Sequence, residues 1–146
     1  MDFTDIDQVI TALYTAISGP AGEQDWALEA RLLHPEARLV RTRVDAEGRP
    51  LIFAFDPAGY RAATEPMLAA APFFEIETAR KLFIFGNIAQ AFSAYEARDA
   101  AEGGALLFRG LNLIHLVHDG ARWWVIHVIW DNEREGVTIP NAAWWG

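Results

Sequence analysis

The stretch from Leu106 to Asn132, LLFRGLNLIHLVHDGARWWVIHVIWDN, restricts the possible folds of this chain more than any other. Its long apolar and β-branched runs predict two β-strands. Asp119-Gly120 predicts the turn between them, because this dipeptide tolerates the positive φ angles of a two-residue hairpin loop. Such a turn would place Asn112 opposite His127 in the hairpin.

Side chains in this hairpin alternate between two faces. The predicted first face carries Phe108, Gly110, Asn112, Ile114, Leu116, Trp123, Val125, His127, Ile129 and Asp131. The second carries Leu107, Arg109, Leu111, Leu113, His115, Trp124, Ile126, Val128 and Trp130. Both faces are largely apolar, whereas a sheet with one face in water would show one polar set. We therefore expect both faces to be covered.

Composition restricts the class of protein. A chain of 146 residues without a linker or an internal repeat predicts a single domain over residues 1–146, with an irregular tail over 133–146. The net charge of −8 and the single lysine argue against nucleic-acid binding. The chain has no cysteine, no visible secretory signal and no apolar run long enough to span a membrane. We expect a cytoplasmic protein.

The first half of the chain predicts helices with one hairpin among them. Thr4 is the predicted N-cap of a first helix, which Gly19-Pro20 ends, and a short second helix follows over about 24–33. The predicted hairpin spans 37–44 and 50–55. Asp56-Pro57 predicts the start of a third helix. Pro66 predicts a kink or a break in that helix.

A further hairpin is predicted over 73–85 and 88–99, with Phe85 opposite Ile88 across Gly86-Asn87. Its predicted inward set, which is mostly small and apolar, is Ile76, Thr78, Arg80, Leu82, Ile84, Ala89, Ala91, Ser93, Tyr95 and Ala97. The opposite set mixes charges with phenylalanines: Glu77, Lys81, Phe83, Phe85, Gln90, Phe92, Glu96 and Arg98. We expect the first set to form a cavity wall.

Two segments resemble a known superfamily. Residues 25–40, DWALEARLLHPEARLV, resemble the helix and first strand of the nuclear transport factor 2-like superfamily, and residues 118–131, HDGARWWVIHVIWD, resemble its last hairpin. The order of predicted elements matches over essentially the whole chain. The resemblance implies an α+β fold, a cone-shaped barrel in which N-terminal helices pack in a strongly curved, mostly antiparallel six-stranded sheet. It also implies a pocket and a homodimer.

The superfamily includes ketosteroid isomerase, scytalone dehydratase, limonene epoxide hydrolase and SnoaL-like cyclases beside non-catalytic domains, so the fold cannot decide the chemistry. Their catalytic sets match this sequence only in part. Asp131 resembles the late-strand acid of limonene epoxide hydrolase, and Tyr14 lies on the helix that carries a tyrosine in ketosteroid isomerase. His127 with Tyr95 is the nearest match to the pairs in scytalone dehydratase.

The candidate site follows from the predicted inward faces. His127 and Asp131 are the candidate catalytic residues, because an imidazole titrates near neutrality and a carboxylate can orient it. Candidate substrate-binding residues are Tyr14, Arg80, Ser93, Tyr95 and Asn112. The four histidines show no spacing typical of a metal set, so we expect neither a metal nor another cofactor.

Each candidate also has a structural interpretation. His127 could be a core histidine bonded to Asn112, Asp131 could cap the tail or pair with an arginine, and Arg80 could balance a buried carboxylate.

The sequence thus leaves two functions open. The chain is expected to bind a small apolar or aromatic molecule, with cofactor-free isomerase, dehydratase, cyclase or hydrolase chemistry as one possibility. The other is a non-catalytic ligand-binding or dimeric assembly module. The expected homodimer surface is the outer sheet face, with Leu111, Leu113, Ile126, Val128 and Trp130.

Overall fold

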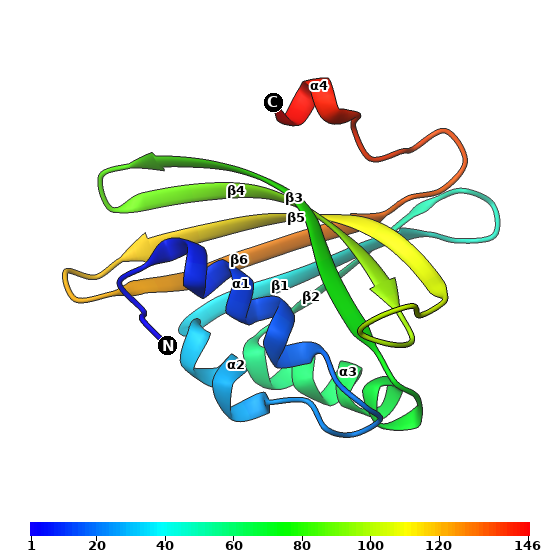
Figure 1. Cartoon of the computed structure of the whole chain (residues 1–146), viewed down its shortest axis with the longest axis horizontal. Helices are drawn as coiled ribbons and strands as arrows, with labels where there is room; N and C mark the ends of the chain where they lie inside the picture. The colour runs from blue at the N-terminus through cyan, green and yellow to red at the C-terminus, as the bar shows by residue number, and fades with distance from the viewer.

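The computed structural model describes all 146 residues and contains one six-stranded sheet that curves around three helices (Figure 1). The strands are β1 (Leu33–Val44), β2 (Pro50–Phe55), β3 (Phe74–Phe85), β4 (Ile88–Arg98), β5 (Leu106–His118) and β6 (Trp123–Asn132). Their order in the sheet is β2-β1-β6-β5-β4-β3. Only β1 and β6 pair in parallel. The predicted α+β fold with a mostly antiparallel curved sheet is confirmed.

The helices lie on both sides of this sheet. Figure 1 shows α1 (Ile6–Ile17), α2 (Trp26–Leu32) and α3 (Pro57–Ala70) on the side toward which the sheet curves, and α4 (Ala142–Trp145) on the other side. No helix has the combination of length and hydrophobicity that crossing a membrane would require. The core lies between the first three helices and the concave face of the sheet. Its fully buried members include Val9 and Ile10 from α1 and Ile114, Leu116 and Val125 from the sheet.

Aspartates cap the helices that position the site. The predicted Thr4 cap of α1 is wrong: Asp5 accepts hydrogen bonds from the two backbone N–H groups that follow in the first turn, while Thr4 bonds to Asp2. The predicted Asp56 cap of α3 is confirmed by a bond from the Gly59 N–H of 2.7 Å. Helix α3 continues through Pro66 to Ala70, so of the predicted kink or break at this proline the break is absent.

The hairpin of β3 and β4 has the predicted turn but not the predicted face along all of β3. Phe85 lies opposite Ile88 as expected, and the register holds as far as Ala79. Thr78 is then an extra residue, a β-bulge. Beyond it, Glu77 pairs with Tyr95. The prediction that Ile76 and Thr78 point inward is therefore wrong, because one extra residue exchanges the two faces of a strand.

The hairpin of β5 and β6 differs from the prediction at its turn. The loop contains four residues rather than two, and His118 pairs with Trp123. The Asp119 carboxylate causes this, because it accepts hydrogen bonds from the N–H groups of Ala121 and Arg122 at 2.8 and 2.9 Å. The predicted register is wrong by two residues. A shift of two leaves each side chain on its predicted face, so the turn alone does not change the pocket.

A second β-bulge changes the faces of β6. His115 pairs with His127 and Leu116 with Val125, so Ile126 is the extra residue. After it, Val128, Trp130 and Asn132 face the concave side, where they line a cavity. His127, Ile129 and Asp131 occupy the other face. The predicted inward positions of His127 and Asp131 and the predicted outward positions of Val128 and Trp130 are wrong for this reason.

The C-terminal tail packs on the convex face of the sheet (Figure 1). It was predicted to be irregular, but it ends in the short helix α4, capped by Asn141. Trp144 packs edge-on against Phe92 of β4, with 5.4 Å between ring centroids. The Lys81 ammonium of β3 donates a hydrogen bond to the Trp144 carbonyl and lies over its ring. The tail therefore covers part of the outer face.

Candidate functional site

A cavity of about 250 Å³ lies between the three helices and the concave face of the sheet. Of its 22 lining residues, 14 are hydrophobic, which suits a largely apolar molecule. Helices contribute Leu13, Tyr14, Ile17, Glu29, Tyr60, Thr64, Met67 and Leu68. The sheet and its connections contribute Leu33, Leu39, Arg41, Thr42, Arg43, Phe73, Glu75, Tyr95, Phe108, Asn112, Ile114, Val128, Trp130 and Asn132.

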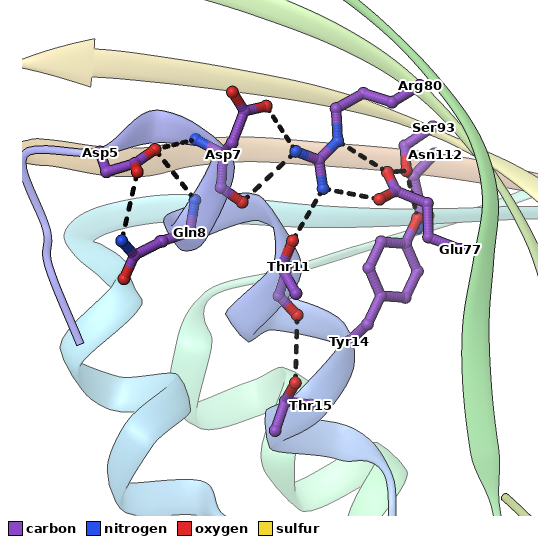
Figure 2. A network of polar contacts seen from close by, with 10 residues as sticks. All are labelled: Asp5, Asp7, Gln8, Thr11, Tyr14, Thr15, Glu77, Arg80, Ser93 and Asn112. Atoms are coloured by element: carbon purple, nitrogen blue, oxygen red, sulfur yellow. Dashed lines mark hydrogen bonds and ion pairs between the residues drawn. The ribbon is translucent and has the colours of Figure 1, made fainter.

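A directed chain of hydrogen bonds runs from Asn112 and Tyr14, which line the cavity, to Ser93 and Glu77 behind them (Figure 2). The Asn112 amide donates to the Tyr14 hydroxyl at 3.0 Å. Tyr14 and Ser93 are joined at 2.6 Å, and Ser93 in turn donates to the Glu77 carboxylate. Because Ser93 gives its hydrogen to Glu77, Tyr14 must give its own hydrogen to Ser93. Tyr14 therefore has no free hydrogen for a ligand, whereas Asn112 keeps its carbonyl oxygen and one N–H.

The chain of hydrogen bonds ends on an ion pair that lies behind the cavity wall. The Arg80 guanidinium donates to both Glu77 oxygens at 2.6 and 3.0 Å. It also bonds Asp7 at 2.6 Å and the Thr11 hydroxyl at 3.0 Å, both on α1 (Figure 2). Arg80 thus joins the sheet to the first helix. This contact agrees with the interpretation that Arg80 balances a partly buried carboxylate.

Tyr95 of β4 lines the cavity beside Tyr14, with 6.1 Å between their ring centroids. Its hydroxyl donates to the Asn132 side-chain oxygen at 3.0 Å, across Gly110 of β5. A Cβ atom at residue 110 would collide with this hydroxyl, so the glycine makes room for the tyrosine. Burial raises the pKa of both Tyr14 and Tyr95, which keeps both hydroxyls protonated.

Glu75 is the titratable group that faces the cavity from β3. The Ser18 hydroxyl accepts a hydrogen bond from the Glu75 N–H at 3.0 Å and donates its own hydrogen to the Tyr14 carbonyl at 2.6 Å. The side-chain carboxyl makes no hydrogen bond and no salt bridge within the protein. Burial raises the pKa of Glu75 to about 8, because no neighbouring cation or donor offsets the loss of solvent. The group is therefore mostly protonated at pH 7.

A second carboxyl lies at the helix side of the cavity. Glu29 of α2 is buried, and its Oε2 atom has no hydrogen-bond partner. Burial raises the pKa of Glu29 to about 7, and Arg61 opposes this shift. Tyr60 of α3 lies near both acids and packs edge-on against Trp130, with 5.9 Å between the Tyr60 and Trp130 ring centroids. Two acids that are at least partly protonated at pH 7 thus line one largely apolar cavity.

The structure brings together only part of the predicted site. Tyr14, Tyr95 and Asn112 line the cavity as predicted. Ser93 is fully buried behind them, and Arg80 lies outside the lining, so neither reaches a ligand directly.

The two predicted catalytic residues lie outside the cavity. His127 is exposed on the convex face, where its ring lies 5.8 Å from that of His115. Asp131 pairs with Arg134 at 2.8 Å, which agrees with the structural interpretation of this residue. Asn112 bonds Tyr14 and lies opposite Trp130, so the expected bond between Asn112 and His127 is absent. The geometric basis for a catalytic pair of His127 and Asp131 is wrong.

Sequence reasoning missed the acids that do face inward. Glu75 and Glu77 alternate on one face of β3, but the unbulged pairing assigned Glu77 to the opposite face. The signal that could have found them is the spacing Glu75-x-Glu77 beside the small residues of β4. No cluster of three or more histidine, cysteine or acidic side chains could hold a metal ion.

This arrangement can bind an apolar molecule and exchange a proton with it. The Glu75 carboxyl supplies a proton near neutrality and removes one at higher pH. Asn112 offers one donor and one acceptor at a fixed place. The aromatic and aliphatic lining reduces the contact of both groups with water.

Comparisons with solved structures identify the fold. A nuclear transport factor 2-like superfamily protein from Salmonella enterica superposes with a TM-score of 0.64 over 88% of this chain and 89% of that chain, at 14% identity. A nuclear transport factor 2-like protein of unknown function from Pseudomonas putida gives 0.66 over 86% and 82%, at 16% identity. A protein of unknown function from Mycobacterium tuberculosis, solved as a variant, gives 0.66 over 88% and 70%, at 15% identity.

Comparisons at the level of sequence find no such likeness. No protein-family model matches the chain, and no curated protein matches it. Identities this low carry the fold and not the chemistry. The superpositions and the curved sheet around α1 to α3 agree with the resemblance found in the sequence. The chain has the nuclear transport factor 2-like fold.

Proposed function

We propose that the cavity binds a small, largely apolar molecule and that Glu75 exchanges a proton with it, without a cofactor. The observation that carries this proposal is the Glu75 carboxyl, which faces the cavity, has no protein partner, and has a pKa of about 8. A carboxyl placed this way is poised for general acid or base chemistry near neutral pH. An isomerisation or dehydration next to a carbonyl group is the type of reaction that such a site suits.

The fixed wall beside Glu75 supports this proposal. The Asn112 amide donates one hydrogen bond to Tyr14, and Tyr14 gives its own hydrogen to Ser93. These bonds fix the direction of the second N–H of the Asn112 amide. A carbonyl oxygen of the ligand would accept that hydrogen bond. The fixed position reduces the reorganisation that a developing negative charge would require.

The test uses 2-tetralone, a bicyclic ketone whose α-hydrogens exchange with solvent. Exchange in deuterium oxide is followed by NMR with wild-type protein, with Glu75→Gln, and with Glu65→Gln as a surface control on α3. We expect wild-type protein to accelerate exchange and Glu75→Gln to lose at least about 100-fold of that acceleration. The pH profile should report a group with a pKa of about 8. Equal rates in wild-type and Glu75→Gln protein would contradict the proposal.

A non-catalytic assembly module is the second candidate. It is favoured by the convex face, where Leu111 and Leu113 of β5 and Ile129 of β6 form an apolar strip beside the C-terminal tail. We propose that two copies pair through this strip as a homodimer. Leu113→Asp should then convert a dimer to a monomer in light scattering, whereas Glu65→Gln should not. A wild-type monomer at micromolar concentration would contradict this pairing.

A further inference from the structure

Two arginines stand at the opening of the cavity. Along β1, Leu39 is buried, Arg41 is partly buried and Arg43 is exposed, and all three line the cavity. The cavity therefore opens toward Arg43. The same opening is bordered on α3 by Met67, which is 52% exposed.

Both guanidinium groups are held by an aromatic ring. Phe53 of β2 pairs directly with Arg41, and the two guanidinium carbons lie 5.3 Å (Arg41) and 4.9 Å (Arg43) from its ring centroid. On the other side of Arg41, the paired residue of β6 is Trp130, which also lines the cavity. Stacking of this kind orients a guanidinium without using its hydrogen-bond donors.

Neither arginine has a carboxylate partner. None of the salt bridges of the chain includes Arg41 or Arg43. The Nε atom of Arg41 is buried and has no hydrogen-bond partner at all. A buried unsatisfied donor on a charged group costs free energy, so such atoms in folded proteins call for an explanation. The chain has 20 acidic residues against 12 basic ones, so a shortage of acids does not explain it.

The acids inside the cavity do not neutralise these arginines. Neither Glu29 nor Glu75 bonds to Arg41 or Arg43, and burial raises the pKa of both acids to about 7 and about 8. Below pH 7 the cavity therefore holds two permanent positive charges at its mouth and two mostly uncharged carboxyls inside. This balance favours an anion over a neutral or cationic molecule.

We propose that the ligand of this cavity is an aromatic or alicyclic carboxylate whose apolar body lies among the rings of the cavity and whose carboxylate binds Arg41 and Arg43 at the mouth. A guanidinium matches a carboxylate with two parallel hydrogen bonds, and no salt bridge within the protein occupies either Arg41 or Arg43. This inference rests on the proposal that the cavity binds a ligand, and it adds the chemical class of that ligand.

The test compares 2-naphthoate with 2-naphthamide, which have nearly the same shape and differ in charge. Isothermal titration calorimetry at pH 6.5 and low ionic strength gives both affinities for wild-type protein and for Arg41→Gln and Arg43→Gln. We expect 2-naphthoate to bind at least about tenfold more tightly than 2-naphthamide. The two variants should lose this preference while keeping the affinity for 2-naphthamide.

Arg38→Gln is the matched control, because it removes the same charge from the same strand. The Arg38 guanidinium bonds only to backbone carbonyls outside the cavity. Its preference for 2-naphthoate should remain. Circular dichroism establishes that each variant is folded.

Four other results have distinct meanings. Equal affinities of the two probes in wild-type protein would overturn the inference and leave the proposed pocket standing. Failure of both probes to bind would contradict the inference and the proposed pocket together. A preference for 2-naphthoate that survives in both arginine variants would overturn the assignment to Arg41 and Arg43. If wild-type protein does not accelerate 2-tetralone exchange but still prefers 2-naphthoate, only the proposed catalysis by Glu75 is contradicted.

Discussion

The two middle strands of the β3 to β6 ribbon, β4 and β5, alternate regularly along the cavity wall, and the extra residue of β5, Leu107, lies beyond it. The two flanking strands, β3 and β6, each contain an extra residue that changes which side chains face the cavity. On β4 and β5, Tyr95 and Asn112 face the cavity as simple alternation predicts. On β3 and β6, Thr78 and Ile126 interrupt the alternation. Beyond its extra residue, each flanking strand therefore turns toward the cavity the residues that the pattern places on the other face.

This difference determines the character of the site. The bulge on β3 turns Glu75 inward, and the bulge on β6 turns His127 outward and Trp130 inward. As a result, the cavity contains the Glu75 carboxyl and not the predicted His127 imidazole. Bulges often re-aim side chains next to functional sites.

The largest expected effect tests the bulge on β6. Val128→Asp places a carboxylate in the core, because Val128 is 8% exposed and packs in the main cluster. We expect a loss of about 4 kcal/mol or more in the free energy of unfolding. His127→Asp, one residue away, should change it by less than about 0.5 kcal/mol. Urea unfolding measures both, and the reverse ranking would mean that β6 has no bulge at Ile126.

The next effect tests the bulge on β3 through pH. A carboxyl whose pKa is about 8 in the folded chain and near 4.5 when unfolded keeps its proton longest in the folded state. Its stabilising contribution is complete below pH 4.5 and is lost as the pH rises through 8. Relative to Glu75→Gln, wild-type protein should therefore lose on the order of 3 kcal/mol between pH 4.5 and 8.5, a value reduced for contact with solvent in the cavity.

Thermal unfolding across this pH range checks the prediction. The difference between wild-type and Glu75→Gln protein should be small near pH 4.5, grow with pH, and level off above pH 8. A constant difference over the whole range would mean that Glu75 titrates normally.

A smaller effect tests which of Glu77 and Thr78 faces the inner side of β3. Glu77→Ala leaves Arg80, whose side chain is 17% exposed, without its bidentate partner, although Asp7 remains bonded to it. We expect a loss of about 2 kcal/mol in the free energy of unfolding. Thr78→Ala should have almost no effect because Thr78 is exposed. Equal losses in chemical denaturation would contradict the observed register.

The smallest effect concerns the regular strands. Tyr14→Phe removes the hydroxyl that joins Asn112 of β5 to Ser93 of β4. We expect a loss of about 1 to 2 kcal/mol, because the buried Ser93 and the partly buried Asn112 each lose one hydrogen-bond partner. Tyr95→Phe, which breaks a single bond to Asn132, should cost less. If Tyr14→Phe left the free energy of unfolding unchanged in denaturant titrations, these hydrogen bonds would not stabilise this part of the protein.

The sequence predicted those features that depend on local patterns. The Asp56 cap, the Gly86-Asn87 turn and the inward side of β4 and β5 follow from residues close together in the chain, and all are confirmed. The α+β class follows from the order of such elements.

The missed features depend on contacts that no local pattern contains. Thr78 and Ile126 have side chains that are common in regular strands, so neither residue indicates a β-bulge in the sequence. The four-residue turn depends on side-chain bonds of Asp119, although Asp119-Gly120 equally fits a shorter loop. Arg41 acquires its neighbours Phe53 and Trp130 only when β1 pairs with β2 and with the distant β6.

The inward position of Glu75 is the claim on which the proposed chemistry depends. A titration by NMR of protein labelled with ¹³C at the glutamate side-chain carboxyls, with the Glu75 signal assigned from its absence in Glu75→Gln, measures its pKa directly. We expect a midpoint of about 8 for Glu75 in the folded protein without ligand. A midpoint near 4.5, the ordinary value for glutamate, would place this carboxyl in water and contradict the proposed site.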